Sequence, residues 1–180
     1  MKKFILFYLF VNYNKCGDTM KEIMIITGAS SGMGREFSMQ IEKKYQVDEI
    51  WVIARRKERL ESLKEKLQTK VKIFALDLTQ KESFEIIQEA LFQEKPRVKV
   101  LVNCSGYGKI DHYENMSSET IENMMNLNML AVVKMVNTVL PYMHKESHIV
   151  NLASCSGYMP IPYLNIYAAS KAFVLNYSRA

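Results

Sequence analysis

The sequence has few of the residues that cross-link or interrupt a chain. Its 180 residues include three cysteines, four prolines and seven glycines. Cys16, Cys104 and Cys155 show no Cys-x-x-Cys spacing and cannot all pair with one another. We therefore expect free thiols in a reducing compartment, which favours a cytoplasmic protein. No Pro/Gly-rich linker, repeat or low-complexity tract divides the chain, so we expect one principal domain.

A segregated charge of one sign is also missing. The formal net charge is +5, but the basic residues are interleaved with acidic ones, as in the segment KERLE at 57–61. This pattern is typical of solvated helix faces, so we expect no nucleic-acid partner. With 48% hydrophobic and 24% charged residues, the composition excludes disordered and collagen-like chains and favours a globular domain with a sizeable core.

The sequence has no apolar run of the about 20 residues that a membrane-spanning helix needs. Residues 4–11 are apolar and follow Lys2 and Lys3, like the start of a secretory signal, but no small-residue cleavage site follows them. Met20 stands directly before the first expected strand. We therefore interpret 1–19 as an N-terminal extension that is either untranslated or disordered, with membrane anchoring as the alternative; no membrane partner is expected.

From residue 20 onward, short apolar runs alternate with longer amphipathic segments. The runs suit strands that are buried on both faces of a parallel sheet, and they are expected at 23–26, 50–54, 71–76, 98–103 and 148–152. Helical spacing of apolar residues lies between them, for example at Met33, Phe37 and Ile41. This alternation predicts an α/β fold, a doubly wound parallel sheet of the Rossmann type in three layers, over residues 20–180.

A glycine-rich turn follows the first expected strand and opens the first helix. Its sequence, TGASSGMG at 27–34, has the spacing Gly-x-x-x-Gly-x-Gly. Glycines allow a tight turn and a close approach to a pyrophosphate, and the helix N-terminus offers unpaired N–H groups. A tight strand-to-helix turn could use glycines for its own geometry. In this position the pattern indicates a dinucleotide site formed by Gly28, Ser30, Ser31, Gly32, Met33 and Gly34.

The end of the second strand indicates which dinucleotide is bound, because it faces the adenosine ribose in such folds. Here Arg55 and Arg56 stand where an NAD-type site favours an acidic residue. Guanidinium groups match phosphate oxygens, so NADP(H) is favoured over NAD(H). The alternative is that the two arginines only begin a charged helix.

The segment YAASK at 167–171 contains a Tyr-x-x-x-Lys pair. With ten tyrosines and abundant lysine, about one such pair is expected by chance, so the pair alone carries little weight. Ser154 lies thirteen residues before Tyr167, and Lys171 lies four after it. On local evidence alone, Tyr167 could equally be a packed aromatic.

Taken in order, these motifs resemble the short-chain dehydrogenase/reductase family over 20–180, and more closely its NADP-preferring carbonyl and ketoacyl reductases. The glycine turn, Ser154, Tyr167 and Lys171 match its pattern. The sequence NCSG at 103–106 matches the family's Asn-Asn-Ala-Gly motif at its outer residues only. By resemblance, the cofactor site gains Asp77, Leu78, Asn103, Gly106, Tyr167 and Lys171, and the catalytic set becomes Asn128, Ser154, Tyr167 and Lys171. Asn126 is the alternative to Asn128.

The resemblance implies an NADP(H)-dependent oxidoreductase that interconverts a ketone or aldehyde and an alcohol. In the family the tyrosine is the acid and base, the lysine lowers the pKa of the tyrosine and holds the nicotinamide ribose, the serine binds the carbonyl, and the asparagine holds a water. No metal site is expected. The family typically has about 250 residues, so the chain would lack the last strands, helices and substrate lid. Homodimers or tetramers are common in the family; the alternative function is a catalytically inactive remnant or dinucleotide-binding module.

Overall fold

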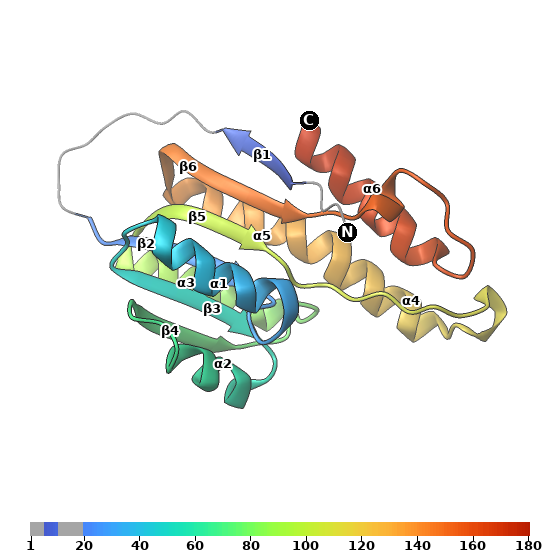
Figure 1. The fold of residues 1–180 in the computed structure, drawn as a ribbon, viewed down its shortest axis with the longest axis horizontal. Helices are drawn as coiled ribbons and strands as arrows, with labels where there is room; N and C mark the ends of the chain where they lie inside the picture. Colours follow the sequence, from blue (N-terminus) through green and yellow to red (C-terminus); the bar gives the residue numbers. More distant parts are fainter. Residues whose placement is uncertain (1–5, 11–19) are drawn as a thin grey trace.

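The computed structural model describes residues 6–10 and 20–180, which form a twisted sheet with helices on both faces (Figure 1). The strands of this part of the chain are β1 (Leu6–Phe10), β2 (Glu22–Thr27), β3 (Glu49–Ala54), β4 (Lys70–Ala75), β5 (Arg97–Asn103) and β6 (Met143–Leu152). The longer helices are α1 (Gly32–Lys44), α2 (Lys57–Lys64), α3 (Lys81–Glu94), α4 (Ser118–Met125), α5 (Ala131–Val139) and α6 (Asn165–Arg179). A π-helical turn, η2 (Asn126–Leu130), joins α4 to α5, and the short 3-10 turns are η1 (Tyr113–Asn115), η3 (Leu140–Tyr142) and η4 (Cys155–Gly157).

The strand order in the sheet is β1-β6-β5-β2-β3-β4, and β2 to β6 run parallel. From β2 the chain winds outward through β3 and β4, then returns to the other side of β2 with β5. The order therefore reverses between β2 and β5. A crevice opens at the carboxyl ends of the strands at such a reversal, which is where open α/β sheets bind ligands.

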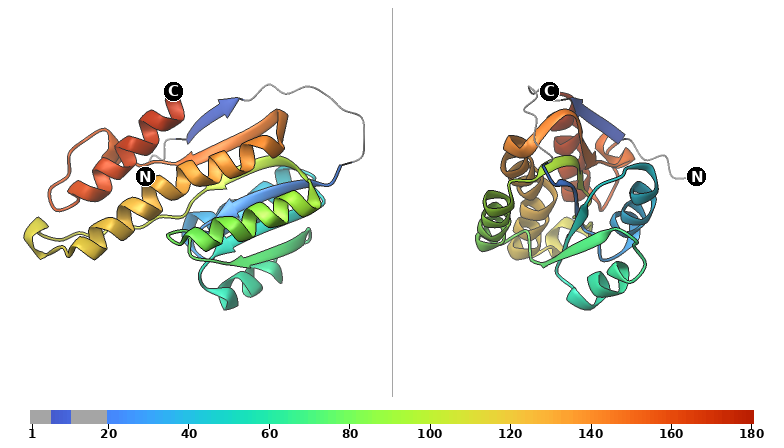
Figure 2. Two further views of the ribbon diagram at one scale, coloured as in Figure 1. Left: turned by 180° about the vertical axis from the view of Figure 1, so that it is seen from behind. Right: turned by 90° about the vertical axis from the view of Figure 1, so that its left-hand side faces the viewer.

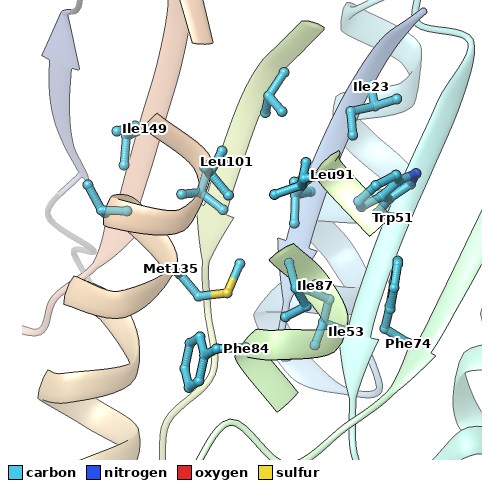
Figure 3. Packing of buried hydrophobic residues seen from close by; sticks show 14 of the residues in the cluster. Ile23, Trp51, Ile53, Phe74, Phe84, Ile87, Leu91, Leu101, Met135 and Ile149 are labelled. Carbon is cyan, nitrogen blue, oxygen red and sulfur yellow. The ribbon is translucent and has the colours of Figure 1, made fainter. Parts of the chain in front are cut away.

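The core consists of two apolar layers, one on each face of the sheet. Alternate residues of a strand point to opposite faces, so Ile23 and Ile25 of β2 pack towards α3 and α5, whereas Met24 and Ile26 pack towards α1 and α2. Figure 3 shows the first layer, in which Met135 of α5 lies among the side chains. Viewed along the sheet in Figure 2, helices cover both of its faces. The predicted three-layer Rossmann-type fold is confirmed.

The expected strands all form, with one clear difference in length. β6 begins at Met143 rather than at residue 148. The exposed Lys145 and Glu146 hid this start, because they interrupt the apolar pattern. The strand continues through them because Met143 is buried and the Ser147 hydroxyl donates a hydrogen bond to the Val98 carbonyl oxygen at 2.7 Å.

Ion pairs connect residues at the amino ends of the strands, at the edge of the sheet opposite the crevice. Glu49, which is 2% exposed, accepts hydrogen bonds from Lys21 and from the Trp51 indole, and forms an ion pair with Lys70 at 3.0 Å. Lys21 also pairs with Glu94. Burial alone would raise the pKa of Glu49, but the hydrogen bonds from Lys21, Trp51 and Lys70 outweigh it and hold the pKa below its ordinary value.

The N-terminal segment adds a strand that the sequence did not predict. β1 pairs antiparallel with β6, with Leu6 opposite Leu152 and Phe10 opposite His148. The other residues of the proposed 1–19 extension lie outside the described residues, and the division of the chain at residue 20 stays a prediction. Within 6–10 and 20–180, no helix is both long enough and apolar enough to span a bilayer.

Candidate active site

The turn between β2 and α1 leaves an uncapped helix N-terminus facing the crevice. Ser31, the N-cap residue of α1, makes no capping hydrogen bond with its side chain, and the first turn has no acidic residue. The first N–H groups of α1 and the positive end of its dipole are therefore available to an anion. These features fit a phosphate group.

Close backbone contacts explain two of the glycines in this turn. Gly28 has φ +68°, and a Cβ there would lie 2.8 Å from the Cys104 backbone. A Cβ on Gly34 would lie 2.4 Å from the Gly28 carbonyl oxygen. Side chains at these positions would push apart the chain segments that form the turn, so the turn depends on both glycines for its shape.

A single pocket at the carboxyl ends of the strands collects most of the residues predicted to bind a dinucleotide. Gly28, Ser30, Ser31, Gly32, Met33, Gly34, Arg55, Arg56, Asp77, Leu78 and Gly106 all line it. Sequence reasoning missed five further lining residues, Ala54, Leu76, Cys104, Ser105 and Leu127. Their only sequence signal is position, because they neighbour predicted site residues.

Asn103 is predicted to bind the cofactor, but it lies beneath the pocket rather than in its lining. Its side chain is 3% exposed and donates a hydrogen bond to Asn151 Oδ1 at 2.9 Å. Asn151 in turn donates to Ser178 Oγ at 3.0 Å, so Asn103 is tied through β6 to α6. The turn after Asn103 is held by Thr27, whose Oγ1 accepts hydrogen bonds from the backbone N–H groups of the next two residues.

The two arginines at the end of β3 have different partners. Arg55 lies 3.7 Å from an Asp77 carboxylate oxygen, and its side chain is 72% exposed. Arg56 turns towards the glycine-rich turn at 27–34, which we call the phosphate turn because its features fit a phosphate group. Its guanidinium donates to Ser30 Oγ at 3.3 Å and to Ser31 Oγ at 3.1 Å. Arg56 and the two serines therefore form a cluster of donors at one end of the pocket.

At the other end of the pocket, Asn128 anchors the loop after β5. It lies in the π-helical turn η2 and is 0% exposed, whereas its alternative Asn126 is exposed. The Asn128 amide accepts from the Tyr107 N–H at 3.0 Å and donates to the Tyr107 carbonyl oxygen at 2.8 Å. It also donates to Ser170 Oγ at 3.1 Å, and Ser170 donates to the Tyr167 carbonyl oxygen at 2.7 Å. Asn128 therefore joins the loop to α6.

Lys171 is buried on α6, one helical turn after Tyr167. Its Nζ donates to the Leu152 carbonyl oxygen at 2.6 Å and lies 5.8 Å from the centre of the Tyr167 ring. Burial lowers the pKa of Lys171 to about 8. A Cβ on Gly106 would lie 3.6 Å from this Nζ, so Lys171 stands directly behind a residue of the pocket wall.

Ser154 and Tyr167 complete the predicted catalytic set, and both are partly exposed. Ser154 follows β6, and its Oγ accepts hydrogen bonds from the Ser156 N–H at 3.3 Å and the Ser156 hydroxyl at 3.0 Å. The ring of Tyr167 lies against Gly108, where a Cβ would come within 2.8 Å of Cδ2. Ser156 and Ser170, which hold these residues, had no sequence signal beyond their proximity to the motifs.

Cys104 lines the pocket as a neutral thiol. Burial raises its pKa to about 12, although the charge of Lys171 opposes the effect. The thiol is therefore protonated over the whole physiological pH range, which is unsuited to a nucleophile.

Known proteins share both the sequence and the fold. The short chain dehydrogenase family model matches residues 22–180. The 3-ketodihydrosphingosine reductase of Bacteroides thetaiotaomicron is 34% identical over 161 residues, which cover 88% of this chain and 56% of that protein. The very-long-chain 3-oxoacyl-CoA reductase of Homo sapiens is 30% identical over 168 residues, covering 88% and 53%. The chain thus spans just over half the length of these relatives.

Solved structures agree with this relationship. Serine dehydrogenase from Escherichia coli superposes with a TM-score of 0.76 at 31% identity, covering 86% of this chain and 72% of that one. A short-chain dehydrogenase from Sphingobium yanoikuyae in complex with NADPH gives a TM-score of 0.75 at 26% identity, covering 88% and 63%. The match over 22–180 and these relatives establish that the chain belongs to the short chain dehydrogenase family.

Proposed function

We propose that the chain is an NADP(H)-dependent oxidoreductase that interconverts a ketone or aldehyde and an alcohol, with Tyr167 as the acid and base. The observation that carries the proposal is the continuity of one pocket. An uncapped helix N-terminus and a cluster of donors border one end of the pocket. Gly106 lines the other end and lies beside Lys171 and Asn128.

The residues present fit a phosphorylated dinucleotide. The glycine turn and the N-terminus of α1 would hold its pyrophosphate, and Asp77 with Leu78 would lie at the adenine. Arg56, Ser30 and Ser31 would bind a 2′-phosphate. When bound, the nicotinamide supplies or accepts the hydride.

Lys171 supports Tyr167 as the proton donor and acceptor. An ammonium held near a phenol stabilises the negative charge that develops when the phenol gives up its proton. With a pKa of about 8, Lys171 is charged at pH 7 and lies one helical turn from Tyr167. Asn128 and Ser170 hold α6 and the loop after β5 in register, so they would position this pair and a water beside it.

Ser154 is suited to binding the oxygen of the reacting carbonyl. The Ser154 Oγ accepts two hydrogen bonds from Ser156, which leaves its own hydroxyl proton for the substrate. A donor that is already oriented stabilises the oxygen as negative charge develops on it. Ser156 would act as a positioning residue for Ser154.

The names of the relatives support reduction as the reaction class. The two relatives described above are named as reductases, one of 3-ketodihydrosphingosine and one of very-long-chain 3-oxoacyl-CoA. The Sphingobium yanoikuyae structure is a complex with NADPH. A ketone reductase using NADPH is the function that agrees with both these names and the arginines at the end of β3.

The test measures NADPH binding and turnover separately. Binding is followed by NADPH fluorescence, and turnover by ketone-dependent loss of absorbance at 340 nm. We expect Tyr167→Phe to retain binding and to abolish turnover, and the matched control Tyr45→Phe, on the far side of the fold, to change neither. Binding without ketone turnover in the unchanged chain would favour the inactive dinucleotide-binding module, and turnover that survives in Tyr167→Phe would refute the acid-base assignment.

A further inference from the structure

Two loops lie near Tyr167, and they are joined to each other. The first, residues 104–116, follows β5, and the second, residues 153–164, follows β6; both extend beyond the carboxyl end of the sheet (Figure 1). The Asp111 N–H donates to the Tyr163 carbonyl oxygen at 3.1 Å. The rings of His112 and Tyr163 meet edge to face with 4.7 Å between their centres. Gly108 of the first loop lies against the Tyr167 ring, so the joined loops border the proposed reaction centre.

Several large apolar side chains of the joined loops are exposed, and we call three of them the apolar lip. Its members are Ile110, 73% exposed, Tyr113, 59% exposed, and Tyr163, 52% exposed. Single exposed apolar residues are common on proteins, but here three of them lie within or next to the Asp111–Tyr163 and His112–Tyr163 contacts. Exposed apolar groups gathered beside a polar reaction centre are typical of a ligand site.

The backbone conformation of Tyr163 supports a role for its ring. Tyr163 has φ +63°, in the left-handed region that favours glycine. Non-glycine residues in this region are strained and cluster at ligand sites. The hydrogen bond from Asp111 helps to hold the strained carbonyl group, and the ring is turned onto His112.

The charges on the first loop argue against an anionic substrate group at the lip. Lys109 forms an ion pair with Asp111 at 2.8 Å, which neutralises both. Glu114, in η1 beside Tyr113, is exposed and has no counterpart among these residues of the loop. A carboxylate or phosphate attached to the substrate would therefore be repelled, whereas an uncharged apolar group would not.

We infer that the apolar lip binds the uncharged apolar group of the substrate, so that the preferred substrates are neutral ketones or alcohols with a long alkyl or a bulky aryl group on the carbonyl carbon. This inference rests on the proposed function, because it assumes that the reacting carbonyl lies between Ser154 and Tyr167. The carbonyl oxygen faces these two hydroxyls. The apolar group of the substrate extends past Gly108 and contacts Ile110, Tyr113 and Tyr163.

The test uses a series of methyl ketones, 2-butanone, 2-hexanone and 2-octanone, with saturating NADPH. Each methylene that the lip removes from water is expected to raise kcat/KM about two- to four-fold, mainly by lowering KM. 7-Oxooctanoate, which has the length of 2-octanone but ends in a carboxylate, is expected to be a poorer substrate than 2-octanone. A kcat/KM that does not rise with chain length would overturn the inference.

Two variants remove lip side chains with little risk to the fold. Tyr163→Gly suits the left-handed backbone, and Ile110→Asn alters a highly exposed residue. Each is expected to lower kcat/KM for 2-octanone about ten-fold and for 2-butanone less than two-fold. The control Phe92→Asn, at a 61% exposed residue of α3, should change neither. Equal losses for both ketones in the lip variants would contradict the inference.

A binding measurement separates failure of the lip from failure of the proposed function. If the chain turns over no ketone, the neutral apolar dye Nile red is titrated onto the NADP-loaded protein and displaced with 2-octanol. If dye binding weakens in Ile110→Asn and Tyr163→Gly, but not in Phe92→Asn, the apolar lip is supported and the proposed reaction class is wrong. Dye binding that is absent, or that is the same in all four proteins, would overturn the lip.

Discussion

The preference for NADPH over NADH that we propose should largely disappear when Arg56 is replaced by alanine. The guanidinium of Arg56 lies over Ser30 and Ser31, at 3.3 and 3.1 Å from their hydroxyl oxygens. The three donors therefore face the same small volume beside the phosphate turn. A ligand that lacks the 2′-phosphate leaves this cluster without an anion, so only NADPH should lose binding energy in Arg56→Ala.

The magnitude follows from the kind of hydrogen bond that is lost. Hydrogen bonds to charged groups contribute about 1.5–3 kcal/mol, and exposure of Arg56 favours the lower part of this range. Since about 1.4 kcal/mol is a factor of ten in affinity, Kd for NADPH should rise about 10- to 30-fold, and Kd for NADH less than three-fold. The difference should shrink at high salt, because the guanidinium and phosphate are partly screened.

Two other arginines provide graded controls for the fluorescence titrations. Arg55→Ala should also weaken NADPH more than NADH, but less than Arg56→Ala does, because Asp77 lies 3.7 Å from the Arg55 guanidinium. Arg35→Ala should leave both affinities unchanged, since Arg35 donates to the carbonyl oxygens of Arg59 and Ser62. Equal weakening of NADPH and NADH in Arg56→Ala would refute the phosphate cluster.

Three further predictions concern the scaffold. Gly34→Ala should cost about 1–3 kcal/mol of stability in urea denaturation and abolish NADPH binding, because the new Cβ would meet the Gly28 carbonyl oxygen at 2.4 Å; full NADPH affinity would contradict this. The Cys104→Ala variant isolates the titration of Lys171, whose pKa is about 8 in the folded chain and 10.5 in the unfolded chain. Its free energy of unfolding should rise with pH from about 8, by up to roughly 3 kcal/mol as the pH nears 10.5, because only the unfolded chain keeps the Lys171 proton in that range. A free energy of unfolding that stays flat would contradict the buried ammonium. With Cys104 present the rise should be smaller above pH 9, because the folded thiol keeps its proton to about pH 12 while the unfolded chain loses it near 9. Glu49→Gln should destabilise the protein at pH 7. It should also reduce the loss of stability below about pH 4.5, because protonation of Glu49, whose pKa is lowered in the folded chain, causes part of that loss. The same loss of stability with pH in both proteins would argue against the ionic cluster.

The sequence predicted the parts of the fold that follow from local pattern. The run at 50–54 is apolar throughout because β3 is buried on both faces, and a continuous apolar run is enough to identify such a strand. The phosphate turn was predictable for a similar reason, since glycines at fixed spacing between a strand and a helix have few alternatives.

Tertiary contacts decided what the sequence could not predict. Arg55 and Arg56 are adjacent and chemically equal, yet Asp77 lies by the first and the phosphate turn by the second. Asn103 matched a motif, but its amide pairs with Asn151, a residue of another strand. The contact between residues 111 and 163 joins two loops far apart in the chain, and no local pattern marks it.

The position of β1 also sets an order of events during folding. Leu6 pairs with Leu152, so almost the whole described chain must be synthesised before β1 has a partner. Contacts this distant in sequence close slowly because the intervening chain loses entropy. The parallel strands β2 to β5 can assemble earlier, around α1, α2 and α3. During that interval the apolar segment from Leu6 to Phe10 would be unpaired, and an unpaired apolar strand is open to aggregation.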